Sequence, residues 1–208
     1  MGNVRILEVK QSIFESNDKQ AALLREELKK DGVFLLNLMS SPGSGKTTTL
    51  TRTIEALKDD LKIGVMEADI DSDVDAETIL KTGAKAIQLH TGGMCHLDAD
   101  MTRQGLKGLG TDDVELVILE NVGNLVCPAM FDLGESKKVV IVSTTEGDDK
   151  PLKYPHIFQE ADICVINKID LAPYLNTKVE VLRENALKVN HRLQIFEVSA
   201  TKGDGMDA

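Results

Sequence analysis

The 208-residue sequence has no tryptophan, and aromatic residues make up only 3% of the chain. A hydrophobic core must therefore be built from Leu, Ile, Val, Ala and Met. No apolar run approaches the roughly 20 residues that a membrane-spanning helix needs, and the N-terminus shows no apolar segment of a secretory signal. The three cysteines, an odd number, argue against a disulfide framework. These absences predict a cytoplasmic protein.

Basic residues are fewer than acidic ones. The chain has 24 Lys and Arg against 34 Asp and Glu, which gives a formal net charge of −10. So acidic a chain binds nucleic acid or anionic membranes poorly unless it carries a local basic patch, and the sequence contains none. We therefore expect neither nucleic acid nor a membrane as a partner.

Strands and helices are predicted to alternate along the chain. Apolar residues at helical spacing predict an amphipathic helix over 18–31, within an N-terminal extension of residues 1–32. Residues 33–208 form the main domain. Apolar runs predict strands at 33–39, 62–68, 84–89, 115–119, 138–143, 163–167 and 195–199. Helices are predicted at 46–57, 76–82, 97–109 and 178–189. This alternation indicates an α/β fold, a mostly parallel sheet with helices on both faces.

A glycine-rich segment after the first strand has the pattern of a phosphate-binding loop, typical of P-loop NTPases. Residues 40–47 read SSPGSGKT, with Ser40 where the usual pattern has Gly. The two glycines let backbone amides turn toward phosphate oxygens, and the following helix N-terminus attracts negative charge. Lys46 should reach the β- and γ-phosphates, and Thr47 should offer its hydroxyl to Mg²⁺. The expected nucleotide-binding residues here are Gly43, Ser44, Gly45, Lys46, Thr47 and Thr48.

The segment Asn-Lys-Ile-Asp after a late strand indicates recognition of guanine. The carboxylate of Asp170 can accept hydrogen bonds from guanine N1–H and the exocyclic amine, a pair that adenine does not offer. Asn167 and Lys168 are expected to hold the loop and flank the ring. Ser199 and Ala200, after the last strand, are expected to supply a backbone amide to the guanine oxygen. An ATP-dependent kinase is an alternative that Asp170 argues against.

Acidic residues end two strands that should neighbour the phosphate loop. Carboxylates are hard ligands, so Asp69 and Glu120 join Thr47 as candidate Mg²⁺ ligands. The amide of Gly123, in the segment ENVG, is a candidate sensor of the γ-phosphate. Asp75 lies in an acidic segment and is a candidate to orient the attacking water, although a solvated acidic loop explains any single Asp there better. The predicted catalytic residues are Lys46, Asp75 and Gly123.

Two cysteines and a histidine suggest a second kind of metal site. Cys95, His96 and Cys127 offer thiolate and imidazole ligands, which suit Zn²⁺ or Ni²⁺ and not Mg²⁺. Three ligands are too few for a closed structural site, so water or a symmetric dimer must complete it. On ligand number alone, a buried cysteine with an incidental histidine is an equal alternative. The position of Cys127, four residues past Gly123, favours the metal site, whereas Cys164 in an apolar strand is assigned to the core.

Five segments together resemble one family. They are SSPGSGKTT (40–48), GGMCHL (92–97), ENVGNLVCP (120–128), TEGDDKPLKYP (145–155) and NKIDL (167–171). From about residue 10 onward the chain resembles the HypB family of SIMIBI-class GTPases, which incorporate nickel into hydrogenase. The similar urease accessory GTPase G has a Cys-Pro-His motif, whereas this chain has Cys95 and His96 with a remote Cys127.

The resemblance implies a cytoplasmic GTPase that uses GTP and Mg²⁺ and forms a GTP-promoted homodimer. It implies nickel delivery to the large subunit of [NiFe] hydrogenase, with the accessory protein HypA as partner, and it maps interface ligands for Ni²⁺ or Zn²⁺ onto Cys95, His96 and Cys127. The N-terminal CxxCGC or His-rich nickel segments of some members are not found here. The family continues into a final helix that we expect this chain to lack after Ala208. A GTPase chaperone for another metalloenzyme and a non-enzymatic zinc-binding module are the alternatives.

Overall fold

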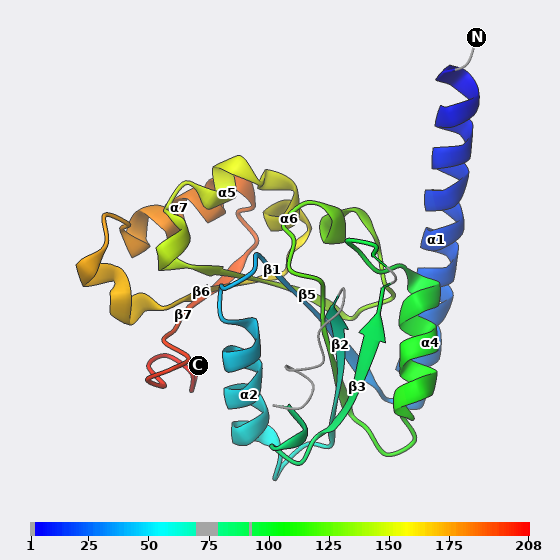
Figure 1. Ribbon diagram of the computed structural model, residues 1–208, viewed down its shortest axis with the longest axis horizontal. Helices are drawn as coiled ribbons and strands as arrows, with labels where there is room; N and C mark the ends of the chain where they lie inside the picture. The colour runs from blue at the N-terminus through cyan, green and yellow to red at the C-terminus, as the bar shows by residue number, and fades with distance from the viewer. Residues whose placement is uncertain (1–2, 70–78, 92) are drawn as a thin grey trace.

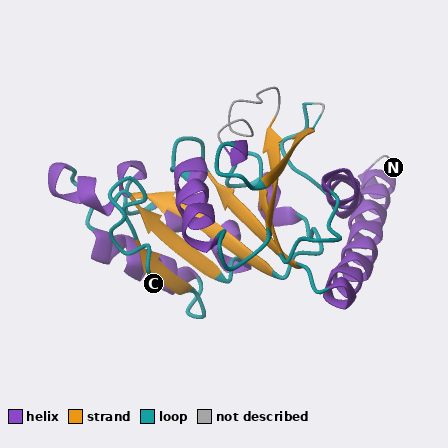
Figure 2. Ribbon diagram, turned by 90° about the horizontal axis from the view of Figure 1, so that it is seen from below, coloured by secondary structure: helices purple, strands orange, loops and turns teal. Residues whose placement is uncertain are grey.

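A seven-stranded sheet lies at the centre of the molecule (Figures 1 and 2). The computed structural model describes the backbone of residues 3–69, 79–91 and 93–208, and the side chains of residues 16–68, 79–91 and 93–208. The strand order is β3-β2-β4-β1-β5-β6-β7, and all neighbouring strands are parallel. The strands are β1 (Phe34–Ser40), β2 (Ile63–Asp69), β3 (Lys85–His90), β4 (Leu116–Glu120), β5 (Lys137–Ser143), β6 (Ile163–Asn167) and β7 (Gln194–Glu197). The predicted strands match these ranges within two residues.

Helices cover both faces of this sheet, as the sequence predicted. The longer helices are α1 (Asn3–Asp31), α2 (Lys46–Leu57), α4 (Ala99–Leu109) and α7 (Val179–Val189). Short helical segments are η1 (Cys127–Met130), η2 (Thr144–Glu146), α5 (Lys150–Lys153), α6 (Pro155–Glu160) and η3 (Ile169–Tyr174). The predicted helix at 76–82 falls partly outside the described residues. Helix α1 is longer than the predicted 18–31 and includes that whole range.

Alternation along the strands sends side chains to the two faces of the sheet, where three apolar clusters form. On one face, α1, α4, α6 and α7 pack on the sheet through aliphatic residues, methionine and Phe158. On the other face, α2 packs through Leu50 and Ile54. In β1, Leu35 and Met39 point to the first face and Leu38 to the second. Both faces are therefore buried, which explains why the strands read as nearly continuous apolar runs.

The N-terminal amphipathic helix is confirmed and packs beside α4 (Figure 1). Its apolar stripe of Ala21, Leu24 and Leu28 is buried, with Leu24 and Leu28 in a core shared with β1, β2 and β4. Among the described helices, none combines the length and the apolar character needed to cross a membrane.

Candidate nucleotide and metal site

The phosphate loop connects the end of β1 to the start of α2. Gly43 and Gly45 have positive φ angles of 75° and 96°, a conformation that side chains with a Cβ rarely adopt. A Cβ on Gly45 would lie 2.4 Å from Nδ2 of Asn167, whereas one on Gly43 would meet nothing within 4 Å. Gly45 therefore needs to be glycine for two reasons, its backbone angle and the close approach of Asn167.

Two polar side chains of the loop, Lys46 and Thr47, converge on the end of β4. Lys46 Nζ donates a hydrogen bond to Ser40 Oγ at 3.0 Å and lies 4.0 Å from Glu120 Oε1. Thr47 Oγ1 donates to the same carboxylate oxygen at 3.3 Å. Ser40, the departure from the usual pattern, also accepts a hydrogen bond from Ser44 Oγ at 2.7 Å. The candidate Mg²⁺ ligands Thr47 and Glu120 are therefore neighbours, and both are hard oxygen ligands.

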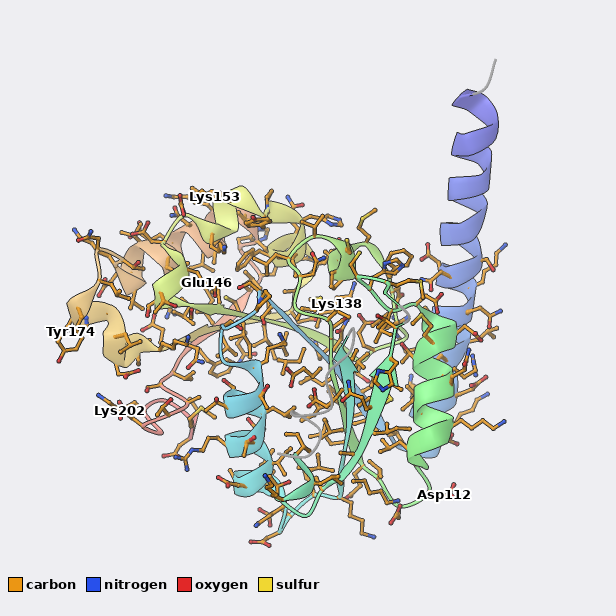
Figure 3. All side chains as sticks on the ribbon, in the orientation of Figure 1. Asp112, Lys138, Glu146, Lys153, Tyr174 and Lys202 are labelled. Atoms are coloured by element: carbon orange, nitrogen blue, oxygen red, sulfur yellow. The ribbon has the colours of Figure 1, made fainter. Side chains whose placement is uncertain are left out.

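A third segment supports the loop from the opposite side. The hydroxyl of Ser41 donates a hydrogen bond to Glu146 in η2, which Figure 3 labels. The carboxylate of Glu146 also accepts from the backbone amide of Ser143 at 2.8 Å. Glu146 belongs to the segment 145–155 that carried the resemblance, and no separate feature of the sequence indicated that it contacts the phosphate loop.

A cavity of about 650 Å³ lies over this edge of the sheet. It is lined by Pro42, Gly43, Gly45, Lys46, Thr47, Thr48, Glu67, Ala68, Gln88, Asn121, Val122, Gly123 and Lys168. Parallel α/β sheets bind ligands in such a place, outside the carboxyl ends of their strands. Gly123 approaches the phosphate loop closely, since a Cβ there would lie 3.1 Å from Cγ of Pro42.

Two polar residues at this cavity were missed by sequence reasoning. Glu67 in β2 lies opposite both Gln88 in β3 and Glu120 in β4, so the three form one row across the sheet. Glu67 is buried, and both amide atoms of Gln88 are buried without a hydrogen-bond partner in the described structure. A buried amide facing a cavity can be satisfied by a ligand or water. The available signal was a polar side chain near the carboxyl end of an otherwise apolar strand.

The remaining two acidic candidates lie outside what the structure describes. Asp69 is the last residue of β2 and is in register with His90, but its side chain is outside the described residues, as is the whole of Asp75. Their roles at Mg²⁺ and at the attacking water stay predictions.

Asn167 joins the three loops of the expected nucleotide site. Its Nδ2 donates to the carbonyl of Ser44 at 2.9 Å, and its Oδ1 accepts from the amide of Ala200 at 3.1 Å. Lys168, with a left-handed φ of 60°, donates from Nζ to the carbonyl of Gly43 at 2.6 Å. The phosphate loop and the expected base loops are therefore held in fixed relation.

Asp170 lies at the far edge of these loops. Its Oδ1 accepts a hydrogen bond from Ser199 Oγ at 2.7 Å, and its Oδ2 lies 3.8 Å from Nζ of Lys202. Lys202 is on the turn after β7 (Figure 3). Its side chain is 61% exposed, so the ion pair contributes little and can be given up. The carboxylate keeps acceptor sites for the two donors of a guanine edge.

The two candidate metal-binding cysteines lie together although they come from different loops, one between β3 and α4 and the other at the start of η1. Cys95 Sγ is 2.9 Å from Cys127 Sγ and 3.9 Å from Nδ1 of His96, and both cysteines are partly exposed. The hydrogen bond with Cys95, and then burial, raise the pKa of the Cys127 thiol. The ring of His96 stacks on Phe131 with centroids 4.1 Å apart, which occupies a face of the imidazole and not its nitrogens. The fold thus brings together two cysteines that lie 32 residues apart in the sequence. The two thiols and the imidazole do not point toward one common metal position.

The ligand chemistry fits a soft or borderline metal. Two sulfurs and an imidazole nitrogen suit Zn²⁺ or Ni²⁺. Within the described residues, no three His, Cys, Asp or Glu side chains are placed to hold a metal ion together. A complete site therefore needs His96 to turn, or further ligands from water or a second copy. Cys164 is fully buried in the core, and burial raises its pKa to about 12, which makes it a poor metal ligand.

Comparisons with known proteins agree on one family. The CobW/HypB/UreG nucleotide-binding domain model matches residues 34–197. The chain is 51% identical over all its residues to the hydrogenase maturation factor HypB of Rhizobium leguminosarum bv. viciae, of which it covers 70%. The structure of HypB from Archaeoglobus fulgidus is 43% identical with a TM-score of 0.87, over 93% of this chain and 94% of that one. HypB from Helicobacter pylori in complex with nickel is 39% identical with a TM-score of 0.85, over 92% and 90%. The resemblance indicated by the sequence motifs is thereby confirmed, and the chain belongs to the HypB family of SIMIBI-class P-loop GTPases.

Proposed function

We propose that this chain is a GTP-hydrolysing nickel chaperone of hydrogenase maturation, in which the nucleotide controls dimerisation and metal binding. The observation that carries the proposal is the short segment 120–127. It contacts the phosphate loop at one end and supplies a thiol beside Cys95 at the other. Similar proteins support the proposal by name, because they are hydrogenase maturation factors and one was solved with nickel.

The nucleotide step uses the phosphate loop of residues 40–47. GTP binds over the loop. The ammonium group of Lys46 then leaves Glu120 and contacts the β- and γ-phosphates. Mg²⁺, when bound with the nucleotide, neutralises charge on those phosphates. Thr47, Glu120 and Asp69 are the residues proposed to hold it, and Asp75 is proposed to orient the attacking water.

Guanine is selected by the carboxylate of Asp170. Its two oxygens accept from N1–H and the exocyclic amine of guanine. The amide of Ala200 donates to Asn167 Oδ1 at 3.1 Å in this structure, so it meets the guanine oxygen by exchanging that bond. Adenine offers neither donor, so the acceptor sites that guanine would fill stay unpaired, and an unpaired buried acceptor costs about 1–3 kcal/mol or more for a charged group.

The metal step follows from movement of segment 120–127. The γ-phosphate draws the amide of Gly123 inward, and Cys127 moves relative to Cys95 and His96. Met94, Val126 and Met130 are exposed within three residues of the cysteines in sequence, and they form an apolar surface on which a second copy docks. Hydrolysis reverses the change and releases the metal to a partner. The proposed partners, HypA and the large subunit of [NiFe] hydrogenase, and a cytoplasmic location rest on the family resemblance alone.

The decisive experiment measures mass in solution and nickel affinity in parallel, with GDP and with a non-hydrolysable GTP analogue. We expect a dimer and a changed nickel affinity with the analogue. Because linkage is reciprocal, nickel must change nucleotide affinity by the same factor. Cys127→Ala should abolish this coupling while leaving GDP affinity within about twofold of wild type. Equal nickel affinity in the two nucleotide states would show that no switch exists.

A further inference from the structure

One buried side chain of α1 contacts both loops that carry the candidate metal ligands. Asn17 is only 8% exposed. Its Oδ1 accepts a hydrogen bond from the backbone amide of Ala99 at 2.9 Å, and its Nδ2 donates to the backbone carbonyl of Asp132 at 2.9 Å. The two contacts span 82 and 115 residues of sequence.

Both partners of Asn17 lie next to the ligands. Ala99 is the first residue of α4, three residues after His96. Asp132 directly follows Phe131, whose ring stacks on His96, and lies five residues after Cys127. The amide of Ala99 belongs to the first turn of a helix, where backbone donors have no partner inside the helix. Asn17 satisfies that donor and thereby fixes where the Cys95 loop enters α4.

The planar side-chain amide of Asn17 sets the distance between the two loops that it contacts. The oxygen and nitrogen of one planar amide each hold one loop, so the separation of the loops follows the size of that group. The site is buried, so water competes weakly for either bond and loss of the amide leaves two backbone groups unsatisfied.

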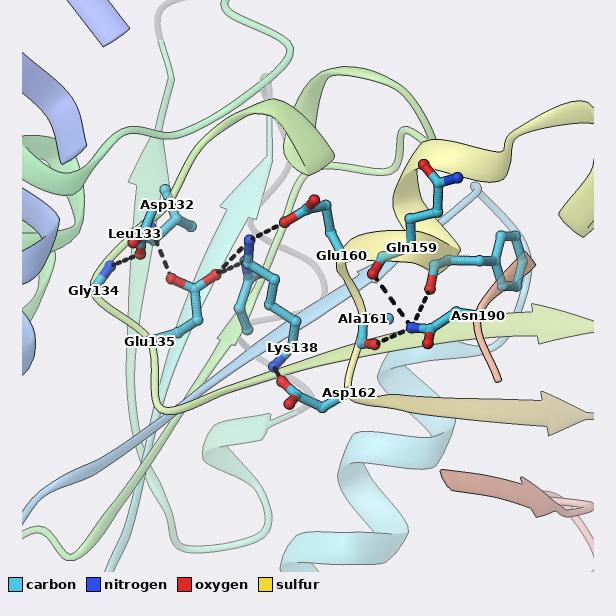
Figure 4. A network of polar contacts seen from close by, with 12 residues as sticks. Asp132, Leu133, Gly134, Glu135, Lys138, Gln159, Glu160, Ala161, Asp162 and Asn190 are labelled. Atoms are coloured by element: carbon cyan, nitrogen blue, oxygen red, sulfur yellow. Dashed lines mark hydrogen bonds and ion pairs between the residues drawn. The ribbon is translucent and has the colours of Figure 1, made fainter. Parts of the chain in front are cut away.

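The loop after Phe131 has few other ways to adjust. Arg25, also on α1, donates from Nε to the carbonyl of Glu135 at 3.0 Å and forms an ion pair with Asp132. Asp132 Oδ1 also accepts from the Gly134 amide at 2.9 Å, and the buried Glu135 accepts from the Leu133 amide at 2.7 Å (Figure 4). These contacts make the loop of residues 131–135 stiff. They therefore fix the position of Phe131, and through its stacked ring the position of His96.

We propose that Asn17 is a positioning residue of the metal site, which holds the Cys95 and Cys127 loops at the separation that metal binding needs. This inference rests on the proposed function, since it assumes that Cys95, His96 and Cys127 bind nickel. Asn17 does not touch the metal, and it acts only through the two backbone contacts. Outer partners of this kind typically change metal affinity by 10- to 100-fold when they are removed.

Asn17→Leu tests the proposal, because leucine keeps the same branching at Cγ without a donor or an acceptor. Asn17→Asp keeps the acceptor for Ala99 and loses the donor to Asp132, so its effect should be intermediate. Glu27→Ala is the matched control. It removes the ion pair between Glu27 on α1 and Arg103 on α4, the same two helices, without contacting either loop.

Two readouts separate positioning from general loss of structure. Nickel titration followed by thiolate-to-nickel charge-transfer absorption gives the affinity. In the metal-free protein, the rate at which dibromobimane bridges two thiols reports whether Cys95 and Cys127 stay close. We expect Asn17→Leu to lose about 10- to 100-fold in nickel affinity and to be bridged more slowly, with GDP affinity unchanged and Glu27→Ala like wild type.

The outcomes distinguish the inference from the function on which it rests. If Asn17→Leu binds nickel and is bridged like wild type while Cys127→Ala loses nickel, the positioning role is wrong and the metal site stands. If wild type shows no thiolate-to-nickel band, the proposed function is wrong, and so is the inference. If Asn17→Leu does not fold, Asn17→Asp decides: wild-type affinity and bridging in that variant would overturn the proposal.

Discussion

The nucleotide end and the thiol end of the candidate site are built in different ways. At the nucleotide end, Ser40 and Ser44 are fully buried, and the loop is held by glycine angles and by Asn167. At the thiol end, Cys95 and Cys127 are partly exposed, and Met94, Val126 and Met130, close to them in sequence, are exposed. The first site is largely preformed within one chain. The second is open, which fits the proposed transfer of a metal ion to a partner.

The two ends also differ in where their support comes from. Residues 40–47 and two nearby loops stabilise the phosphate site, so most of its contacts are short-range or lie along one edge of the sheet. The thiol pair depends on α1, which contacts both loops through Asn17. A change in nucleotide should therefore leave the first site rigid and move the second.

Lys46→Ala is expected to have the largest effect, because it should lower GTP hydrolysis at the nucleotide end without changing nickel affinity at the thiol end. Loss of a charge aimed at the transferred phosphoryl group should reduce kcat for GTP hydrolysis by about 10²- to 10³-fold. Nickel affinity without nucleotide should stay as in wild type, because Lys46 contacts only Ser40 and Glu120 in the described structure. Lys58→Ala, just past the far end of α2, is the control and should change neither quantity. A parallel loss of nickel affinity without nucleotide would show that the two ends are not separable.

A smaller effect is expected from a pair of glycine variants in the phosphate loop. Gly43→Ala strains only a positive φ, which costs about 1–3 kcal/mol. Gly45→Ala has the same strain and also places a Cβ 2.4 Å from Nδ2 of Asn167. Its free energy of unfolding should therefore be about 1–3 kcal/mol lower than that of Gly43→Ala. Denaturant unfolding of both variants measures the difference. Equal loss in the two would mean that Asn167 gives way freely and does not hold the loop.

Features with a local sequence signature could be predicted. The strands follow from apolar runs buried on both faces, and α2 from the phosphate-loop pattern that precedes it. Helix α1 was predicted only over 18–31, because its stripe of Ala21, Leu24 and Leu28 marks just the part that packs on the core. The short segments α5 and α6 were missed because so few residues show no helical period.

Features that depend on distant partners could not be predicted. A side chain such as Asn17, bonded to backbone atoms 82 and 115 residues away, leaves no periodic or local mark in the sequence. The same holds for Glu135, whose carboxylate meets Asn37 from the middle of β1. Glu67 and Gln88 are an intermediate case, because a polar residue in an apolar strand was visible but had no assigned partner. The nucleotide end of the candidate site could thus be predicted from the sequence, and the thiol end only in part.

The smallest effect is expected at Glu135, in the loop of residues 131–135 next to the thiol end. Burial raises the pKa of this carboxyl above its ordinary value of 4.5, although Lys138 and Asn37 oppose the shift. As pH rises past 4.5 the unfolded chain therefore loses its proton first, and the folded state binds more protons. The Glu135 contribution to the free energy of unfolding must then fall with rising pH until the folded carboxyl also ionises. The fall is about 1.4 kcal/mol for each unit by which the pKa is raised.

Glu135→Gln removes this titration, so the stability of wild type relative to the variant should decrease from about pH 4 to neutrality. Glu160→Gln is the matched control, because Glu160 pairs with the same Lys138 at 3.4 Å but lies on an exposed surface (Figure 4). Its stability relative to wild type should change little with pH. Denaturant unfolding over this pH range measures both differences. A constant difference between wild type and Glu135→Gln would show that the pKa of Glu135 is the same in the folded and the unfolded chain, so that Lys138 and Asn37 cancel the effect of its burial.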